Sequence, residues 1–467
     1  MANEAHYDLI IIGTGSGNTI LTPEFDDKKV AIVEHGAFGG TCLNVGCIPT
    51  KMYVLAADAA YAPRESQRLG VDLEFKGADW PAIVDRVFTN RIDVIAEGGE
   101  SYRRSEACPN VDVYDGTATF VGEKRIRTAA GDQPFEITAD QILLAAGSRP
   151  RIPEWAEGVP FHTNEDIMRL PQQPKSLTIV GGGFIAMEFA HVFEALGTDV
   201  TVISRSPFLR SLDSTIGEQF NTIAQQRFNT KLGRTVVDAT GDSTQVTLTL
   251  DDGSSVTSEA LLIATGRIPN GDVLEAPTGG VELDERGRVC VDEYGRTTAD
   301  GVWALGDISS PYQLKHVANA EARAVTQNIL DTFAGKEPMR IMPHEHVPWA
   351  VFTHPQIATV GLTEEQAVEG GFDVTVKVQN YGDVAYGWAL EDTTGVCKLV
   401  ADRATGRLLG AHYMGPQAST LIQQMITVMA FDLDLREFPR KQYWIHPALP
   451  EVTENAILGL DLEFAEN

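Results

Sequence analysis

The sequence predicts an α/β fold with two nucleotide-binding units and a third, C-terminal unit. A short apolar run that ends in glycines occurs twice, as YDLIII (7–12) before GTGSGN and as Leu177–Val180 before GGGF. Such runs are typical of strands that are buried on both faces of a parallel sheet. Each is followed, after a segment that can form a helix, by a second apolar run, KVAIVE (29–34) or DVTVIS (199–204). This order is that of Rossmann-like dinucleotide-binding domains.

The predicted boundaries between domains follow from a second internal similarity. QILLAAGSRPR (141–151) and ALLIATGRIPN (260–270) both consist of an apolar strand, a turn of small residues, an arginine and a proline. Proline and polar residues gather again near 336–343, which indicates another connection. We therefore expect a discontinuous first domain (1–149 and 268–336), a second domain (150–267) and a C-terminal α+β domain (337–467). In the last domain we expect short strands over 391–415, with a hairpin loop at DRATG, and a helix over 420–430.

Composition excludes several classes of function. The 467 residues carry a formal net charge of −28, which argues against binding to nucleic acid or to an anionic membrane surface. The start of the chain lacks the pattern of a signal peptide, and no apolar run approaches the ~18 residues of a membrane span. We therefore expect a cytoplasmic protein. Five cysteines are too few and of the wrong parity for a disulfide-stabilised scaffold, and we assign no residues to a metal site.

The first glycine segment has the features of a pyrophosphate site. Gly13 permits a tight turn, and Gly15 lets backbone N–H groups approach a phosphate at the N-terminus of a helix. Glu34 ends the next strand, where an acid accepts hydrogen bonds from an adenosine ribose. Asn18 stands in place of the usual third glycine, so we expect the following helix to pack differently on the sheet.

Two cysteines lie close together in GGTCLNVGCIPTK (39–51). In a regular helix, Cys42 and Cys47 would be separated by about 7.5 Å along the axis. A disulfide needs Cα atoms about 4.4–6.8 Å apart, so the helix must be distorted between them, which Gly46 and Pro49 allow. A close pair in a reducing compartment indicates redox catalysis, and the start of a helix would stabilise a thiolate. The other cysteines, Cys108, Cys290 and Cys397, are interpreted as packing residues.

The second glycine segment predicts the coenzyme. GGGFIA (181–186) precedes a strand that ends at Ser204 and is followed by Arg205, with Arg210 further on. An acid at this place would bind the ribose of NADH, whereas arginines pair with the 2′-phosphate of NADPH. We therefore expect NADPH.

GGTCLNVGCIPTK resembles the active-site segment of the class I pyridine nucleotide–disulfide oxidoreductases. The resemblance extends over the whole chain, through GVWALGDISSPYQLKHVA (301–318) and WIHPALPE (444–451). It implies FAD in the first domain, NADPH in the second and electron transfer through both to a disulfide substrate. It also implies that Cys42 exchanges with the substrate, that Cys47 forms a thiolate against the flavin, and that Lys51 lies near the flavin, paired with Glu188.

The same resemblance assigns the remaining site residues. His446 is the expected general acid–base and Glu451 orients it; in the family this histidine reaches the active site of the other subunit, so a homodimer is expected, with a C-terminal dimerisation domain. Asp307 is expected to bind the ribityl chain, and His316 to lie near the pyrimidine end of the flavin. The other residues expected at the cofactors are Ser16, Gly17, Gly40, Thr41, Ala118, Gly147, Gly181, Gly183, Ile185, Gly266 and Leu314.

Differences among family members narrow the substrate. The tail DLEFAEN has none of the redox residues that mercuric reductases and large thioredoxin reductases need. NTILTPEFDDKKV (18–30) lacks the arginines that would hold the carboxylates of glutathione. Dihydrolipoamide dehydrogenases usually bind NAD, which disagrees with Arg205 and Arg210. GTGSGN with its short helix, CIPTK, LKHVANAEAR and YWIHPALPEVTENAILGL resemble the mycothione reductase branch most, so we expect NADPH-dependent reduction of mycothione.

Two alternatives stay open at this point. One is a dihydrolipoamide dehydrogenase or another reductase of low-molecular-weight disulfides. The other is a flavin-binding structural or signalling protein without turnover, which the presence of Cys42, Cys47, His446 and Glu451 disfavours.

Overall fold

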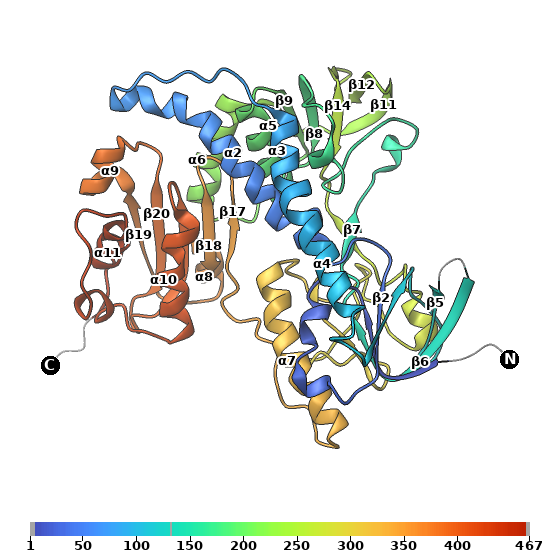
Figure 1. The fold of residues 1–467 in the computed structure, drawn as a ribbon. Coiled ribbons are helices and arrows are strands. Elements are labelled where there is room, and N and C mark those ends of the chain that lie inside the picture. The colour runs from blue at the N-terminus through green and yellow to red at the C-terminus, as the bar shows by residue number, and fades with distance from the viewer. Residues whose placement is uncertain (1–4, 131–132, 464–467) are drawn as a thin grey trace.

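The computed structural model describes residues 5–130 and 133–463. Its strands form three larger sheets, one in each predicted part of the chain, and two small ones. Figure 1 shows the C-terminal part, in orange and red, beside the two N-terminal parts, which lie one above the other. None of the described helices combines the length and the apolar character that crossing a membrane requires.

The first sheet is mixed. Its parallel strands run in the order β3-β2-β1-β6, with β16 on the other side of β6, and β5 and β4 extend it in the antiparallel sense. The strands are β1 (Ala5–Ile12), β2 (Val30–Glu34), β3 (Val111–Asp115), β4 (Thr119–Gly122), β5 (Arg125–Ala130), β6 (Gln133–Leu144) and β16 (Val302–Ala304). The predicted strands at 7–12 and 29–34 are therefore confirmed within one or two residues.

The second sheet is parallel, in the order β10-β9-β8-β14, and an antiparallel three-stranded sheet accompanies it. Its strands are β8 (Ser176–Val180), β9 (Asp199–Ser204), β10 (Asn229–Leu232) and β14 (Ala260–Ile263), and the small sheet holds β11 (Val236–Asp242), β12 (Gln245–Leu250) and β13 (Ser255–Ser258). Two connecting strands, β7 (Ser148–Pro150) and β15 (Arg267–Pro269), pair with each other between the first and second sheets. They come from the two similar segments recognised in the sequence.

The C-terminal sheet is antiparallel, in the order β17-β18-β21-β20-β19. Its strands are β17 (Trp349–Val351), β18 (Ile357–Gly361), β19 (Val374–Asn380), β20 (Val396–Asp402) and β21 (Leu408–Met414). The turn after β20 falls on DRATG, and the helix expected over 420–430 is α10, so both predictions are confirmed. The proposed domain division assigns one large sheet to each part.

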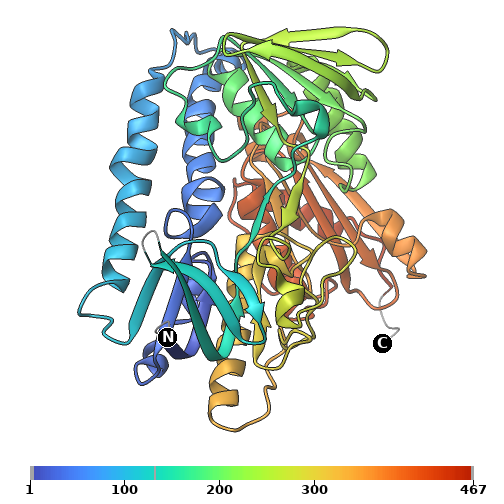
Figure 2. The ribbon, with the colours of Figure 1, turned by 90° about the vertical axis from the view of Figure 1, so that its right-hand side faces the viewer.

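Helices cover these sheets. In Figure 2, α2 and the α3–α4 segment stand side by side along one edge of the molecule. The α-helices are α1 (Gly40–Asn44), α2 (Cys47–Ser66), α3 (Trp80–Val87), α4 (Asp93–Arg103), α5 (Phe184–Ala195), α6 (Ser214–Arg227), α7 (Lys315–Phe333), α8 (Glu364–Glu369), α9 (Ala385–Leu390), α10 (Ala418–Ala430) and α11 (Pro450–Leu458). The short helical turns are η1 (Gly17–Ile20), η2 (Pro23–Phe25), η3 (Gln67–Leu69), the π-turn η4 (Phe88–Ile92), η5 (Glu154–Ala156), η6 (Ile167–Arg169), η7 (Ala276–Gly279), η8 (Gly306–Ile308), η9 (Tyr381–Asp383) and η10 (Phe438–Arg440).

The segment after β1 forms two short 3₁₀ turns, η1 and η2, in place of a regular helix. Asn18 accepts a hydrogen bond on its side-chain oxygen from Arg103 Nε at 2.9 Å. Pro23 begins η2, where its missing N–H costs nothing. The helix that we expected after the first glycine segment is therefore absent, and Asn18 lies in the first of these two turns.

In both nucleotide units, the turn after the first strand contains a glycine that no other residue can replace without strain. Gly13 has φ +98°, and a Cβ placed on it would lie 2.4 Å from the carbonyl oxygen of Ala145. Gly181 has φ +143°, and its Cβ would lie 2.2 Å from the carbonyl oxygen of Ala264. In each unit the glycine turn therefore packs directly against the backbone that follows the neighbouring strand, which leaves the carboxyl ends of the strands open for a ligand.

We predict that Gly13→Ala lowers the thermal midpoint by several degrees more than Gly70→Ala does. Both glycines have positive φ, which costs an alanine about 1–2 kcal/mol, but a Cβ at Gly70 meets no atom within 4 Å. Differential scanning fluorimetry of the two variants separates backbone strain from the additional clash at Ala145. Equal midpoints would contradict the close packing at Gly13.

Candidate active site

The two cysteines lie on either side of a break between two helices. Helix α1 ends at Asn44, and α2 begins at Cys47. The Asn44 amide holds the preceding loop by donating to the carbonyl oxygens of Ala37, Phe38 and Gly40 at 3.0–3.2 Å. A Cβ on Gly46 would lie 2.9 Å from the carbonyl oxygen of Thr41, so the break requires glycine. The distortion predicted from the spacing of the cysteines is therefore present.

The two thiols are hydrogen-bonded to each other and differ in acidity. The hydrogen bond from Cys47 lowers the pKa of Cys42 to about 7, against the opposing effect of burial. The charge of Lys315 and the backbone N–H groups of Cys47 and Ile48, in the first turn of α2, lower the pKa of Cys42 further. The same hydrogen bond and burial raise the pKa of Cys47 well above its usual value. With both thiols reduced, Cys42 therefore ionises first.

One turn into α2, Lys51 forms an ion pair with a buried carboxylate of α5. Lys51 Nζ lies 2.6 Å from Glu188 Oε2, and the other oxygen, Oε1, accepts a hydrogen bond from Phe352 N at 3.0 Å. The ammonium also lies 4.3 Å from the centre of the Phe352 ring. This pair links the helix that carries Cys47 to the helix that follows the second glycine segment.

The first glycine segment can accept a dinucleotide. Gly15 and Gly40 touch backbone to backbone, since a Cβ on Gly40 would lie 2.7 Å from Gly15 Cα. Beside them, Ser16 Oγ accepts from Lys315 Nζ at 2.8 Å and donates to Asn319 Oδ1 at 3.1 Å. This backbone-lined cradle next to a lysine suits a pyrophosphate and fits FAD.

Glu34 and Thr14 brace the same cradle. Glu34 Oε2 accepts from Thr14 N at 2.9 Å and from Thr14 Oγ1 at 2.7 Å, and Oε1 accepts from the N–H groups of His35 and Gly36, each at 2.9 Å. The predicted ribose acceptor thus lies at the carboxyl end of β2, and it also organises the loop around it. Ala118 is buried just before β4, and Thr41 is exposed in α1.

The second flavin motif lies where the connecting strands meet the first sheet. Asp307 Oδ2 accepts a hydrogen bond from Ser148 Oγ at 2.8 Å, and Ser148 Oγ accepts one from Arg267 Nε at 2.7 Å. Burial lowers the pKa of Arg267, and the charge of Asp307 opposes this effect. Leu314 is the N-cap residue of α7. His316, in the first turn of this helix, has its Nε2 atom 2.8 Å from the Pro348 carbonyl oxygen. A Cβ added at Gly147 would meet no atom within 4 Å.

The second glycine segment also has free space beside its glycines. A Cβ added at Gly183 or at Gly266 would meet no atom within 4 Å, and Ile185 is half-buried in the first turn of α5. Arg205 and Arg210 are both exposed, and neither makes an ion pair with the part of the chain that the structure describes. Two exposed guanidinium groups beyond the end of β9 fit the 2′-phosphate of NADPH.

His446 and Glu451 form a hydrogen-bonded pair at the opposite end of the chain. His446 Nδ1 lies 2.8 Å from Glu451 Oε1, and Glu451 Oε2 accepts from Ala448 N at 3.1 Å. The bond with His446 lowers the pKa of Glu451. The pair stands at the start of α11, which packs on β19 and β20 on the outer side of the C-terminal sheet (Figure 1).

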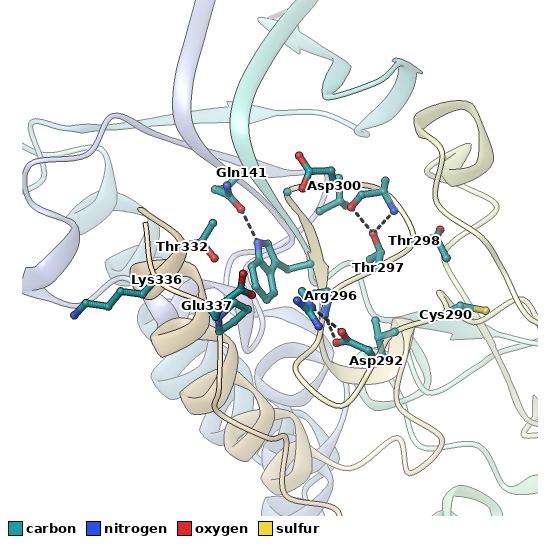
Figure 3. Close-up of a pocket in the computed structure, with 16 residues that line it drawn as sticks. Gln141, Cys290, Asp292, Arg296, Thr297, Thr298, Asp300, Thr332, Lys336 and Glu337 are labelled. Carbon is teal, nitrogen blue, oxygen red and sulfur yellow. Dashed lines mark hydrogen bonds and ion pairs between the residues drawn. The ribbon is translucent and has the colours of Figure 1, made fainter. Parts of the chain in front are cut away.

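A separate groove of about 700 Å³ lies beside the start of β16 and Gln141 of β6 (Figure 3). Its polar groups are largely engaged, because the Trp303 indole donates to Gln141 at 2.7 Å and Arg296 is paired with Asp292 at 2.6 Å. Cys290 lines this groove and is only half-buried, so the interpretation as a packing residue suits it less well than the buried Cys108 and Cys397. No residue of the two glycine segments lines this groove.

Three residues that contact the predicted site residues, directly or through one another, escaped the sequence interpretation. Lys315 contacts Ser16 and lowers the pKa of Cys42, while Ser148 and Arg267 connect Asp307 to the crossing strands. Lys315 stands between two residues that were assigned, Leu314 and His316, and this position is the signal that could have identified it. No comparable signal marks Ser148, because its role depends on a contact with a residue 159 positions away.

Two nucleotide-binding units and a dithiol at a helix break define a pyridine-nucleotide-linked disulfide oxidoreductase. The chain belongs to the pyridine nucleotide–disulphide oxidoreductase family: the family's main model matches residues 7–324, and its dimerisation domain matches 347–457. The predicted fold class, the family and the enzyme class are thereby confirmed, as are FAD and NADPH as the cofactors of the family. The dimerisation domain supports a homodimer.

Similar proteins extend over almost the whole chain. Mycothione reductase of Mycobacterium tuberculosis is 54% identical, with 97% of this chain and 99% of the relative covered. Dihydrolipoyl dehydrogenase of Corynebacterium glutamicum is 33% identical, with 97% and 98% covered. Among solved structures, the HOCl-induced flavoprotein disulfide reductase of Escherichia coli superposes with a TM-score of 0.83 at 28% identity, covering 97% of this chain and all of that one.

We predict that alkylation of reduced Cys42 by iodoacetamide follows pH with a midpoint near 7. Only the thiolate reacts, so the rate rises as pH passes through this value and levels off above it. In Cys47→Ala the midpoint moves upward, because the largest contribution that lowers the pKa is lost. Mass spectrometry identifies the modified cysteine, and a midpoint near 9 in the unaltered protein would refute the proposed arrangement.

Proposed function

We propose that this protein is an NADPH-dependent flavoprotein that reduces mycothione, the disulfide of mycothiol, in the cytoplasm. The observation that carries the substrate assignment is the 54% identity to mycothione reductase over 97% of the chain. The dithiol, the lysine–glutamate pair and the histidine–glutamate pair support the same chemistry. Identity to dihydrolipoyl dehydrogenase is lower, at 33%, and disfavours the first alternative.

The residues present determine the thiol steps. FAD, held by the first glycine segment, would supply the transfer of two electrons from NADPH to the disulfide between Cys42 and Cys47. The Cys42 thiolate then attacks one sulfur of the substrate, so that a mixed disulfide forms and one thiolate leaves. His446 donates a proton to the leaving thiolate. Cys47 attacks Cys42, which restores the protein disulfide and releases the second thiol.

The two glycine segments would hold the two cofactors. Gly13, Gly15, Ser16 and Gly40 would receive the pyrophosphate of FAD, with Asp307 at the ribityl chain. Gly181 and Gly183 would receive the pyrophosphate of NADPH, with Arg205 and Arg210 at the 2′-phosphate. Lys51 would stand beside the flavin, held by Glu188.

His446 would act in the active site of the partner subunit. In the single chain, its side chain is 69% exposed while its neighbours Tyr443 and Ile445 are 102% and 75% exposed. Large apolar side chains at such exposure are typical of a surface that association covers. A dimer that buries this segment would therefore bring the histidine of one subunit to the dithiol of the other.

The substrate assignment is tested by steady-state oxidation of NADPH and NADH with mycothione, glutathione disulfide and lipoamide in parallel. We expect rapid turnover with NADPH and mycothione and at least about a hundredfold lower kcat/KM with the other disulfides, because specific polar contacts discriminate by this much or more. Preference for NADH with lipoamide would overturn both the coenzyme and the substrate, and would leave the dithiol chemistry intact.

The role of His446 is tested with hybrid dimers. Homodimers of Cys42→Ser lack the attacking thiolate and should be inactive, and homodimers of His446→Gln should lose activity by about 10²–10⁴-fold, the usual contribution of a general acid. Purified hybrid dimers that carry one subunit of each, distinguished by affinity tags, should regain about half of wild-type activity, since one of two symmetric sites is then complete. If His446 served its own subunit, both sites of the hybrid would be defective and no activity would return.

A further inference from the structure

The segment between β9 and α6, residues 205–212, carries both arginines assigned to the coenzyme and is called here the coenzyme loop. Its middle is fixed within the second domain. Leu209 N donates to the carbonyl oxygen of Gly182 at 2.8 Å, and Leu209 has φ +51°. Phe208 N donates to Asn221 Oδ1 at 2.8 Å, and Asn221 Nδ2 returns a hydrogen bond to the Phe208 carbonyl oxygen at 3.0 Å. Arg210 follows directly after these contacts.

The far end of the coenzyme loop is held by a different domain. Asp213 caps α6 by accepting from Thr215 N at 3.1 Å, and its side chain is fully buried. Its carboxylate lies 2.8 Å from Nζ of Lys398, which comes from β20 of the C-terminal sheet and is 1% exposed. The same ammonium lies 2.6 Å from Glu364 Oε2, and Asp213 Oδ2 accepts from Glu364 N at 3.1 Å. Arg210 therefore lies between two fixed points: the contacts of Phe208 and Leu209 within its own domain, and the contact of Asp213 with Lys398 of the dimerisation domain.

The contact between the two domains is an ion pair, because Asp213 and Lys398 both stay charged although they are buried. Burial alone would raise the pKa of Asp213, but hydrogen bonds from Lys398 and from the Glu364 amide hold it below its usual range. Burial would likewise lower the pKa of Lys398, and its bonds to the two carboxylates raise it. Both groups therefore stay charged, and loss of Lys398 would leave the Asp213 carboxylate without a cation inside the protein.

We propose that Lys398 is a positioning residue for the coenzyme: by holding Asp213, it fixes the end of the coenzyme loop and thereby places Arg210 to select NADPH over NADH. This inference rests on the proposed assignment of Arg205 and Arg210 to the 2′-phosphate. It adds that coenzyme selectivity depends on a residue of β20, 185 positions beyond its partner in the sequence.

The first experiment compares wild type with Lys398→Met by calorimetric titration of NADP⁺ and NAD⁺ into the FAD-loaded protein. We expect the Kd of NADP⁺ to rise about tenfold, as for loss of one charge-assisted contact, and that of NAD⁺ to change by less than about twofold. The kcat at saturating NADPH should be retained, because Lys398 contacts no reacting atom. Trypsin should cleave after Arg210 several-fold faster, since an unanchored loop opens more often.

Gln219→Met provides the matched control. Gln219 Nε2 donates to the Thr394 carbonyl oxygen at 2.9 Å, so it also connects α6 to the C-terminal domain, but it does not touch the coenzyme loop. Its Kd values and cleavage rate should equal those of wild type. Because Lys398→Met leaves Asp213 unpaired, the double variant Asp213→Asn/Lys398→Met, in which no buried charge remains, is tested beside it and should show the same rise for NADP⁺.

The inference is overturned if a folded Lys398 variant binds NADP⁺ as wild type does, or if the affinities for NADP⁺ and NAD⁺ fall equally. Faster cleavage after Arg210 with unchanged affinities would overturn it too, since the anchor would then hold the loop without acting on the coenzyme. Arg210→Gln separates these results from a failure of the proposed function. Wild-type affinity for NADP⁺ in Arg210→Gln would overturn the assigned phosphate site, and the selectivity claimed for Lys398 with it.

Discussion

The arrangement of the active site depends on the packing of α2 against α5. These helices start at the two chemically important places, since α2 begins at Cys47 and α5 begins just after Gly183. Three polar pairs connect them, at successive turns of α5 and at every second turn of α2: Lys51 with Glu188, Asp58 with His191, and Arg64 with Glu194. Apolar residues of both helices share one core cluster that surrounds these pairs.

The middle pair shows how tightly this interface is specified. His191 is fully buried, with Nε2 2.8 Å from Asp58 Oδ1 and Nδ1 2.8 Å from Arg227 Nη2. Since the arginine can only donate, Nδ1 must accept and Nε2 must carry the proton toward Asp58. Burial lowers the pKa of His191, which favours this neutral form. A shift of α2 along α5 by one turn would break all three pairs at once, so the distance between dithiol and coenzyme cradle is set by side-chain chemistry.

Local patterns in the sequence were sufficient for the strands, the glycine turns and the break between the cysteines. Gly13 and Gly181 are required by backbone contacts that any chain with this strand order must make, and the helix break follows from the spacing of Cys42 and Cys47. Contacts between distant segments were not accessible in this way. Lys398 and Asp213 each look like ordinary surface charges in the sequence, and only the meeting of two domains buries them. The substrate, too, came from resemblance and not from any pattern of spacing.

The paired strands β7 and β15 have a consequence for the architecture as a whole. Ser148 lies opposite Pro269, so the chain leaves the first domain and returns to it at neighbouring points. A segment with adjacent ends can be added to a folded domain without stretching or threading either one. The second nucleotide unit therefore has the geometry of a module inserted into a loop of the first. It repeats the first unit's strand and glycine turn, but it continues into the regular helix α5, where the first unit has only the short turns η1 and η2.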